Sequence, residues 1–270
     1  MTVPSTAPPT TCYRHPSRAT GLRCSTCGRP ICPDCTVMAA VGQLCPDDAR
    51  ARGAQQVIRP ARRRRAAPVT TFIIAVTAAV FLVGLVSTDI RQELFAAFAQ
   101  VNVLVAAGEW WRLITPVLLH ASITHILFNM WALWQLGPRI EQSIGTWSYA
   151  LAYLAAAAWG GAFAFWMGGR DMVAVGASGA IFGLFGMWLV AAFHRRETRF
   201  GRSLLSQLGG LLVINALLPL FLPGIAWQAH LGGLLAGVAM AELWRKVDGQ
   251  TARAAVNFGM LVAAVAAVML

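Results

Sequence analysis

Long apolar stretches dominate the chain after residue 68, whereas the first 68 residues are polar. Seven of these stretches are each close to the roughly 20 residues that a helix needs to span a bilayer. Their approximate limits are 69–87, 121–140, 147–167, 177–194, 203–222, 227–244 and 254–270. The pattern predicts an all-α polytopic membrane protein, in which a bundle of seven transmembrane helices follows a small polar domain.

The composition supports a membrane protein. Of the 270 residues, 57% are hydrophobic and only 12% are charged, about half the charged fraction of a typical soluble domain. The first 68 residues hold no apolar run long enough for the core of a secretory signal, so we expect no signal peptide. Lys246 is the single lysine among many arginines, and Ala and Gly are abundant, which favours a GC-rich bacterial source. We therefore expect a bacterial cell membrane.

The distribution of basic residues predicts the orientation of the bundle. With the polar domain inside, the inner loops hold Arg139, Arg195, Arg196, Arg199, Arg202, Arg245, Lys246 and Arg253. The outer segments hold only Arg91, Arg112 and Arg170. Because cytoplasmic loops carry an excess of Lys and Arg, the N-terminus is expected in the cytoplasm and the C-terminus outside.

The net charge of +11 raises the question of nucleic acid. Many of these charges precede the first span, and residues 49–68 read as a linker that contains the basic run 59–65. Juxtamembrane arginines contact anionic lipid headgroups and set orientation. We therefore expect contact with the lipid bilayer and no nucleic-acid partner.

All six cysteines lie within a domain at 1–48, in pairs with a two-residue gap that suits zinc. The four pairs are Cys12 with His15, Cys24 with Cys27, Cys32 with Cys35, and Cys45 with Asp48. Eight ligands predict two structural zinc ions, from pairs taken either in sequence or interleaved. The alternative is a disulfide framework, which a cytoplasmic location disfavours because thiols stay reduced there.

The pair pattern resembles a B-box-type zinc finger over about 40 residues. This resemblance implies interleaved sites, one of Cys12, His15, Cys32 and Cys35 and one of Cys24, Cys27, Cys45 and Asp48. Asp48 is the least usual ligand, since structural zinc sites favour Cys and His. With four ligands each, neither site leaves a position for a catalytic water. We expect a docking or regulatory surface for a cytosolic protein, in a domain whose folding depends on zinc.

A serine and a histidine stand out in the membrane domain, predicted at 69–270. Ser178 begins the fourth span within Gly176-Ala177-Ser178-Gly179, and His230 begins the sixth. An ionisable side chain inside a span is costly and usually functional. In the predicted topology both residues lie a few residues below the outer face, so they suit a nucleophile and its base.

The second span adds polar side chains at related positions. His125 and Asn129 are four residues apart and share a helix face, and His120 precedes them. On their own, such residues also serve as bridges between membrane helices. Beside a serine nucleophile, His125 and Asn129 are candidates to donate hydrogen bonds to an oxyanion.

Taken together, these stretches resemble the rhomboid family of intramembrane serine proteases. The matching residues are Trp111, Arg112, His120, His125, Asn129, Gly176 to Gly179, His230, Gly233 and Gly237, within residues 69–270. The resemblance implies a six-helix bundle with one extra C-terminal helix. It implies cleavage of membrane-anchored protein substrates near the outer face, without a catalytic cofactor.

The resemblance also implies residue roles. Ser178 would be the nucleophile and His230 its general base and acid, in a dyad without a carboxylate. His125, Asn129 and the Ser178 backbone N–H would stabilise the oxyanion. His120 would order the site and its waters, and Trp111 with Arg112 would brace the outer segment 89–120.

Packing residues complete the sequence picture. Gly179 and Gly183 on the fourth span, and Gly233 and Gly237 on the sixth, give each helix a smooth stripe that allows close approach.

Two polar residues are expected to be structural. Glu141 would pair with Arg139 or another inner arginine, and Asn215 would bond between helices.

Two non-catalytic interpretations remain beside the protease. One is a rhomboid-like protein without activity that binds membrane clients. The other is a zinc-finger scaffold or transporter, which should have polar residues through the full membrane thickness. The presence of both Ser178 and His230, and the restriction of polar residues to the outer half, favour the protease.

Overall fold

The computed structural model describes residues 10–39, 42–51, 66–221 and 224–270, and the chain divides into two compact units, 1–65 and 66–270. The basic run 59–65 and most of the predicted linker lie outside the described residues. At the described ends of the predicted linker, one helix extends to Ala51 and the next begins at Pro68.

The first unit, which we call the head, is small and has little regular structure. Its elements are η1 (Pro33–Cys35), β1 (Val37–Met38), β2 (Gln43–Leu44) and α1 (Pro46–Ala51), with β1 and β2 antiparallel. Besides cysteines, the buried core formed by its described residues holds only Ile31, Leu44 and Ala49. So few apolar side chains cannot offset the chain entropy lost on folding. The head therefore needs another source of stability.

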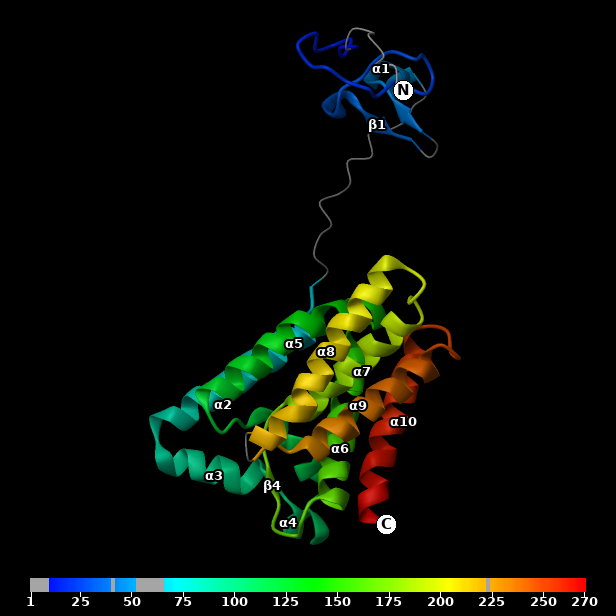
Figure 1. The fold of residues 1–270 in the computed structure, drawn as a ribbon. Coiled ribbons are helices and arrows are strands. Elements are labelled where there is room, and N and C mark those ends of the chain that lie inside the picture. The colour runs from blue at the N-terminus through cyan, green and yellow to red at the C-terminus, as the bar shows by residue number, and fades with distance from the viewer. Residues whose placement is uncertain (1–9, 40–41, 52–65, 222–223) are drawn as a thin grey trace. The chain divides into compact units, whose positions relative to one another are not determined.

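The second unit is a helical bundle (Figure 1). Its long helices are α2 (Pro68–Val86), α5 (Ile123–Ile144), α6 (Thr146–Met167), α7 (Ser178–Phe193), α8 (Arg199–Phe221), α9 (Trp227–Trp244) and α10 (Gln250–Met269). Each overlaps one predicted span, which confirms the seven-helix fold. By length and composition, α2, α6, α8 and α10 are apolar enough to cross a membrane. Helix α7 is shorter, and α5 and α9 carry polar side chains of the candidate site.

The segment between α2 and α5 folds into short elements. They are α3 (Thr88–Phe98), β3 (Gln100–Val101), α4 (Asn102–Ala106), η2 (Trp110–Leu113) and η3 (Thr115–Leu118). Helix α3 starts at a serine cap, where Ser87 Oγ accepts from the backbone N–H of Asp89. β3 pairs antiparallel with β4 (Val173–Ala174), which lies just before α7. The short sheet thus ties this segment to the start of α7.

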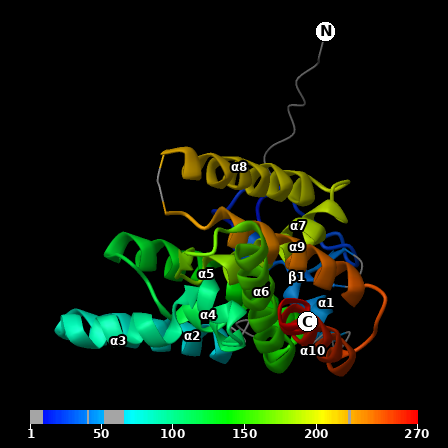
Figure 2. The same ribbon diagram turned by 90° about the horizontal axis from the view of Figure 1, so that it is seen from below.

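Small residues fill the centre of the bundle, where α6, α7 and α9 pack together. Buried alanines such as Ala155 and Ala156 of α6 and Ala180 of α7 let these helices approach closely. Helix α8 lies at the edge of the bundle in Figure 2, and most of its side chains are exposed. Large apolar side chains on the outer surface, such as Phe72, Leu82 and Phe221, suit contact with lipid.

Glu141 is structural, but among the described residues its partners are backbone and threonine donors and not the predicted arginine. Its carboxylate is 1% exposed and accepts hydrogen bonds from the backbone N–H groups of Val69 and Thr70, each at 2.9 Å. It also accepts from Thr70 Oγ1 at 2.8 Å. These are first-turn donors of α2, which has no side-chain cap of its own. A helix N-terminus has free N–H groups and a positive dipole end, so it stabilises a buried carboxylate there.

Asn215 also differs from the prediction. Its Nδ2 donates to the carbonyl oxygen of Leu211 at 2.8 Å, one turn earlier in α8. The amide is therefore satisfied within its own helix. Among the described residues, helix α8 contributes only Gly201 and Leu208 to the buried positions of the bundle.

Candidate active site and candidate metal centres

The structure brings Ser178 and His230 into hydrogen-bond contact. His230 Nε2 lies 2.8 Å from Ser178 Oγ, although 52 residues separate them in the sequence. Ser178 is the first residue of α7, and His230 lies in the first turn of α9. With its proton on Nδ1, the neutral imidazole accepts the serine O–H at Nε2. Among the described residues, no carboxylate hydrogen bonds to His230.

The loop before Ser178 is fixed at two points. β4 pairs with β3, and the Gly176 N–H donates to the carbonyl oxygen of Pro116 at 2.9 Å. Gly176 has φ +122°, a backbone conformation that side chains disfavour. A Cβ here would also lie 2.6 Å from His125 Nε2. The position therefore needs glycine both for its conformation and for the imidazole beside it.

The orientation of His230 depends on a residue that the sequence interpretation missed. The Phe182 ring stacks on the His230 ring, with centroids 4.2 Å apart and planes 6° from parallel. Phe182 lies one turn after Ser178 on the same face of α7. Its i, i+4 spacing from the serine was the available signal, although an apolar residue in a span usually needs no functional explanation.

Glycines allow α7 and α9 to approach closely enough for the serine–histidine contact. A Cβ on Gly233 would overlap the carbonyl oxygen of Gly179, and a Cβ on Gly237 would overlap that of Gly183. The two predicted stripes therefore meet face to face, backbone against backbone. Any side chain at these positions would push the helices apart.

The predicted oxyanion donors, His125 and Asn129, differ in their contacts. The His125 imidazole packs against Gly176, two residues before Ser178. Asn129 is 6% exposed, and its Nδ2 donates to the carbonyl oxygen of His125 at 2.9 Å. The amide is thus satisfied within α5. Its second N–H is not engaged by that bond, since an amide nitrogen has two donors.

His120 is buried behind His125. Its side chain is 2% exposed, and its ring lies edge-on to the His125 ring with centroids 4.9 Å apart. Neither of its ring nitrogens has a hydrogen-bond partner among the described residues. A buried polar atom without a partner usually marks a place for an ordered water.

A small cavity of about 30 Å³ opens beside the nucleophile. Ser178 and Gly179 line it from α7, and Gly160 and Gly161 line it from α6. Gln100 also lines the cavity, and its Nε2 donates a hydrogen bond to the carbonyl oxygen of Gly161 at 2.9 Å. The glycines leave room for a small group next to Ser178.

Arg112 fastens the outer segment from within. Its guanidinium is 5% exposed and bonds to the carbonyl oxygens of Ala99 at 2.7 Å and Ala96 at 2.8 Å. Its Nε donates to Glu109 at 2.6 Å. The carbonyls belong to the end of α3, where backbone acceptors lack helical partners. Trp111, in contrast, is 40% exposed.

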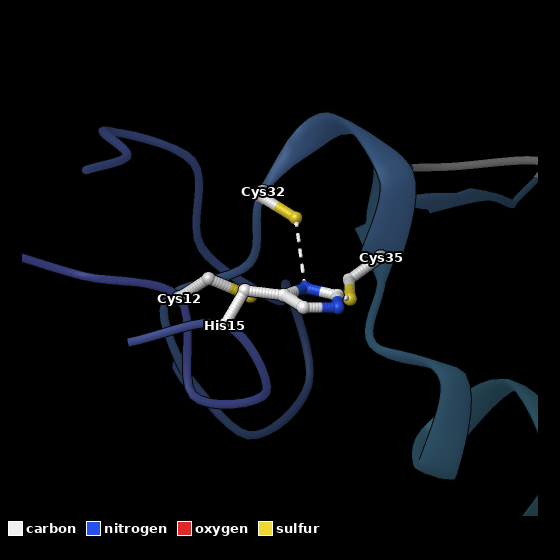
Figure 3. A group of neighbouring side chains, drawn as sticks. All are labelled: Cys12, His15, Cys32 and Cys35. Atoms are coloured by element: carbon white, nitrogen blue, oxygen red, sulfur yellow. Dashed lines mark hydrogen bonds between the residues drawn. The ribbon is translucent and has the colours of Figure 1, made fainter. Parts of the chain in front are cut away.

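In the head, the structure groups the predicted ligands in the interleaved way. We call Cys12, His15, Cys32 and Cys35 the first cluster, shown in Figure 3. His15 Nδ1 lies 3.8, 3.4 and 3.4 Å from the sulfurs of Cys12, Cys32 and Cys35. Tetrahedral zinc with ordinary Zn–S and Zn–N bonds separates such atoms by about 3.5 Å. The first cluster therefore fits a zinc ion.

We call Cys24, Cys27, Cys45 and Asp48 the second cluster. The sulfurs of Cys27 and Cys45 are 3.7 Å apart, close to the about 3.8 Å of two thiolates on one zinc. Hydrogen bonds from the Cys27, Cys24 and Cys45 thiols lower the pKa of Asp48 to about 2. The carboxylate is therefore ionised and able to bind a cation. All six cysteines are free thiols.

Comparison with known proteins identifies the family to which the helical bundle belongs. A sequence model of the rhomboid domain matches residues 107–246, which is just over half of the chain. The chain belongs to the rhomboid family. A relative from Bacillus subtilis (strain 168) named "Putative rhomboid protease YdcA" is 36% identical over 179 residues, covering 65% of this chain and 88% of the relative. The rhomboid protease GluP of the same organism is 37% identical over 158 residues, 58% of this chain and 31% of GluP.

The relatives extend beyond bacteria. The chloroplastic RHOMBOID-like protein 9 of Arabidopsis thaliana is 32% identical over 148 residues, 52% of this chain and 32% of the relative. Membership of this serine protease family confirms the resemblance found in the sequence and the assignment as an enzyme. Together with the apolar helices, it makes the chain an integral multi-pass membrane protein.

Proposed function

We propose that this rhomboid is an intramembrane endopeptidase with Ser178 as nucleophile and His230 as its base. The observation that carries the proposal is the 2.8 Å contact between Ser178 Oγ and His230 Nε2. A serine hydroxyl is a weak nucleophile until a neighbouring base takes its proton. Ser178 and His230 lie on different helices, so their contact requires α7 and α9 to approach each other closely. The two glycine stripes allow this approach.

The chemistry follows from these positions. Ser178 Oγ attacks the carbonyl carbon of the scissile peptide bond while His230 Nε2 takes the serine proton. The imidazolium then gives this proton to the leaving amine, and an acyl-enzyme on Ser178 remains. A water molecule, deprotonated by His230, attacks this ester and releases the new carboxyl end, and His230 returns the proton to Ser178 Oγ. The stacked Phe182 ring holds the imidazole in place through both steps.

The start of α7 suits stabilisation of the negative charge that develops on the carbonyl oxygen. The residue before Ser178 is Ala177, which has no side-chain acceptor to cap the helix. The first N–H groups of α7 and its positive dipole end therefore point toward the reacting centre. His125 and Asn129 add side-chain donors once the Asn129 amide turns from the carbonyl of His125.

The substrates we propose are membrane-anchored proteins, cut near the outer end of their transmembrane segment. The support is the position of both dyad residues at helix ends that the charge pattern places toward the outer face. Water is available there and absent from the bilayer core. Small side chains next to the scissile bond fit the glycine-lined cavity beside Ser178. We place the protein in a bacterial cell membrane with the head in the cytoplasm.

We propose that the head binds two structural zinc ions, one in each cluster, and serves as a docking or regulatory domain for a cytosolic protein. The supporting observation is that two groups of four ligand atoms lie within 4.8 Å of one another inside each group. Zinc would cross-link a head whose apolar core is otherwise too small. The linker 49–68 would connect this domain to the protease domain at 69–270.

The decisive test compares the purified protein with Ser178→Ala on a model transmembrane substrate in liposomes. We expect cleavage by the wild type and none above background by the variant. A fluorophosphonate should label the wild type at Ser178 only. Equal cleavage by both proteins, or labelling at another residue, would favour the non-catalytic client-binding alternative or a different nucleophile.

A further inference from the structure

We propose that the two metal sites of the head are unequal. The first cluster holds its zinc tightly and releases it slowly, whereas the second cluster is an exchangeable site whose occupancy follows the supply of zinc. This inference rests on the proposed binding of zinc by the head. Three independent features of the second cluster carry it: the chemistry of one ligand, the positions of the ligand atoms, and their exposure.

The ligand sets differ at a single position. The first cluster offers three sulfurs and the imidazole of His15, whereas the second offers three sulfurs and the carboxylate of Asp48. Zinc in structural sites is held by thiolate and imidazole, and harder oxygen ligands suit Mg²⁺, Ca²⁺ and Mn²⁺ better. The second cluster therefore has one ligand that binds zinc less strongly than its counterpart in the first.

The atomic positions show the same difference. All three distances from His15 Nδ1 to sulfur are within a few tenths of an ångström of a tetrahedral edge, as given above. Asp48 Oδ2 instead lies 3.0 Å from Cys24 Sγ and 3.2 Å from Cys45 Sγ. Zinc would hold these atoms about 3.5 Å apart. Asp48 is thus placed to accept thiol hydrogen bonds, and it must withdraw to become a ligand.

The exposure of one ligand gives a route by which zinc can exchange. The three cysteines of the first cluster, Cys12, Cys32 and Cys35, are all buried. In the second cluster, Cys27 is exposed. A chelator can therefore approach the second cluster along Cys27, replace the weakly held carboxylate and remove the metal. The first cluster offers no exposed thiol to such an attack.

Loss of this zinc would loosen a defined part of the head. Cys45 follows β2, and Asp48 lies in α1, so the second cluster ties residues 43–51 to the turn at Cys24 and Cys27. Without metal, α1 keeps the bonds of Asp47 to Tyr13, Arg14 and Arg29. The two ion pairs are partly exposed and contribute little. The supply of zinc would then control whether residues 43–51 of the head are ordered.

The experiment follows zinc release from the zinc-loaded full-length protein in detergent, with the chromogenic chelator 4-(2-pyridylazo)resorcinol. We expect two phases of equal amplitude, a fast one and a slow one. Iodoacetamide added after the fast phase should modify Cys24, Cys27 and Cys45 and spare the other three cysteines, as read by mass spectrometry. Hydrogen exchange should increase over residues 43–51 in the same interval.

Matched variants assign the phases. Asp48→Cys should slow the fast phase toward the slow one, because it replaces the carboxylate by a thiolate. His15→Cys, the same exchange at the other site, should leave the fast phase unchanged. Release of both zincs in one phase, or labelling of Cys12, Cys32 and Cys35 first, would overturn the inference while leaving zinc binding intact. A protein that binds no zinc would overturn both.

Discussion

Single side chains decide the chemistry of the candidate site, and each depends on a close neighbour. Ser178 and His230 are in hydrogen-bond contact. Gly176, Phe182 and the glycine stripes provide the local packing for this contact. The sequence predicted the pair from the similar depth of both residues in the membrane, and the glycine stripes from their spacing. It did not show that the amide of Asn129 bonds to its own helix. That bond becomes visible only when side-chain conformations are known.

The proposed oxyanion role of Asn129 is testable by truncation. We expect Asn129→Ala to lower kcat on a transmembrane substrate about 100-fold, since one oxyanion donor typically contributes that much. KM should change little, because the interaction forms only in the transition state. Asn215→Ala is the matched control, because the Asn215 amide donates to the carbonyl oxygen of Leu211 within α8. A near wild-type kcat for Asn129→Ala would exclude it as a donor.

The buried carboxylate of Glu141, which caps the N-terminus of α2, can be tested by truncation. We expect Glu141→Ala to lower stability by about 1–3 kcal/mol, because three donors at the start of α2 lose a charged acceptor. Thermal unfolding in detergent measures the effect. Glu93→Ala removes an exposed carboxylate from α3 and should leave the unfolding temperature unchanged. Equal unfolding temperatures for both variants would show that the cap contributes nothing.

At the scale of elements, the contact between α7 and α9 sets the distance between the dyad atoms. The two helices carry one catalytic candidate each at corresponding ends, and their glycines face each other. The sequence indicated the stripes, but small residues are common in membrane helices of every kind. Which stripes meet is a property of the packed bundle.

The dependence on close approach predicts a sharp effect of one methyl group. Gly233→Ala should separate α7 from α9 and abolish the hydrogen bond between Ser178 and His230, because the added Cβ overlaps the backbone of Gly179. We expect fluorophosphonate labelling of Ser178 to fall to near background. Gly259→Ala on α10 is the control, since its Cβ would meet nothing within 4 Å. Unchanged labelling of Gly233→Ala would contradict the proposed role of the stripes.

At the scale of the whole molecule, the chain combines two units that are stabilised in different ways. The bundle has a continuous apolar core between its helices, whereas the buried residues described in the head include five cysteines of its two clusters. The two units are compact separately. Their responses to the removal of metal should therefore differ.

We expect a chelator to unfold the head and leave the bundle intact. After full removal of zinc by EDTA, hydrogen exchange should rise throughout residues 10–51 and stay unchanged in α6, α7 and α9. Zinc analysis of the untreated protein should give about two ions per chain. Protection of the head that survives complete removal of zinc would show that the metal is not what stabilises it.

The orientation can be tested with the native cysteines alone. All six lie between residues 12 and 45, so a membrane-impermeant maleimide reports only the location of the head. After chelation, we expect no labelling in intact cells and full labelling in permeabilised cells. A variant with Gly169→Cys, in the segment expected outside, should be labelled in intact cells. Labelling of the wild type in intact cells would reverse the proposed topology.

Most of the fold was predictable because membrane spans follow simple rules. Length and hydropathy gave all seven helices within a few residues, including α10, whose start the sequence placed four residues late. The segment between α2 and α5 was less accessible. Its elements α4 and β3 are short, and the partner of β3 lies more than 70 residues away. Local patterns carry no information about such pairings.

The sequence by itself determined the helices, the residue types of the site and the ligand pairs of the head, because these depend on local composition and spacing. The tertiary structure decided which of them meet. It paired α7 with α9, placed Phe182 on His230, gave Glu141 to the start of α2 rather than to an arginine, and grouped the ligand pairs in interleaved order. Contacts between distant segments depend on how surfaces fit, and that fit exists only once the chain is packed.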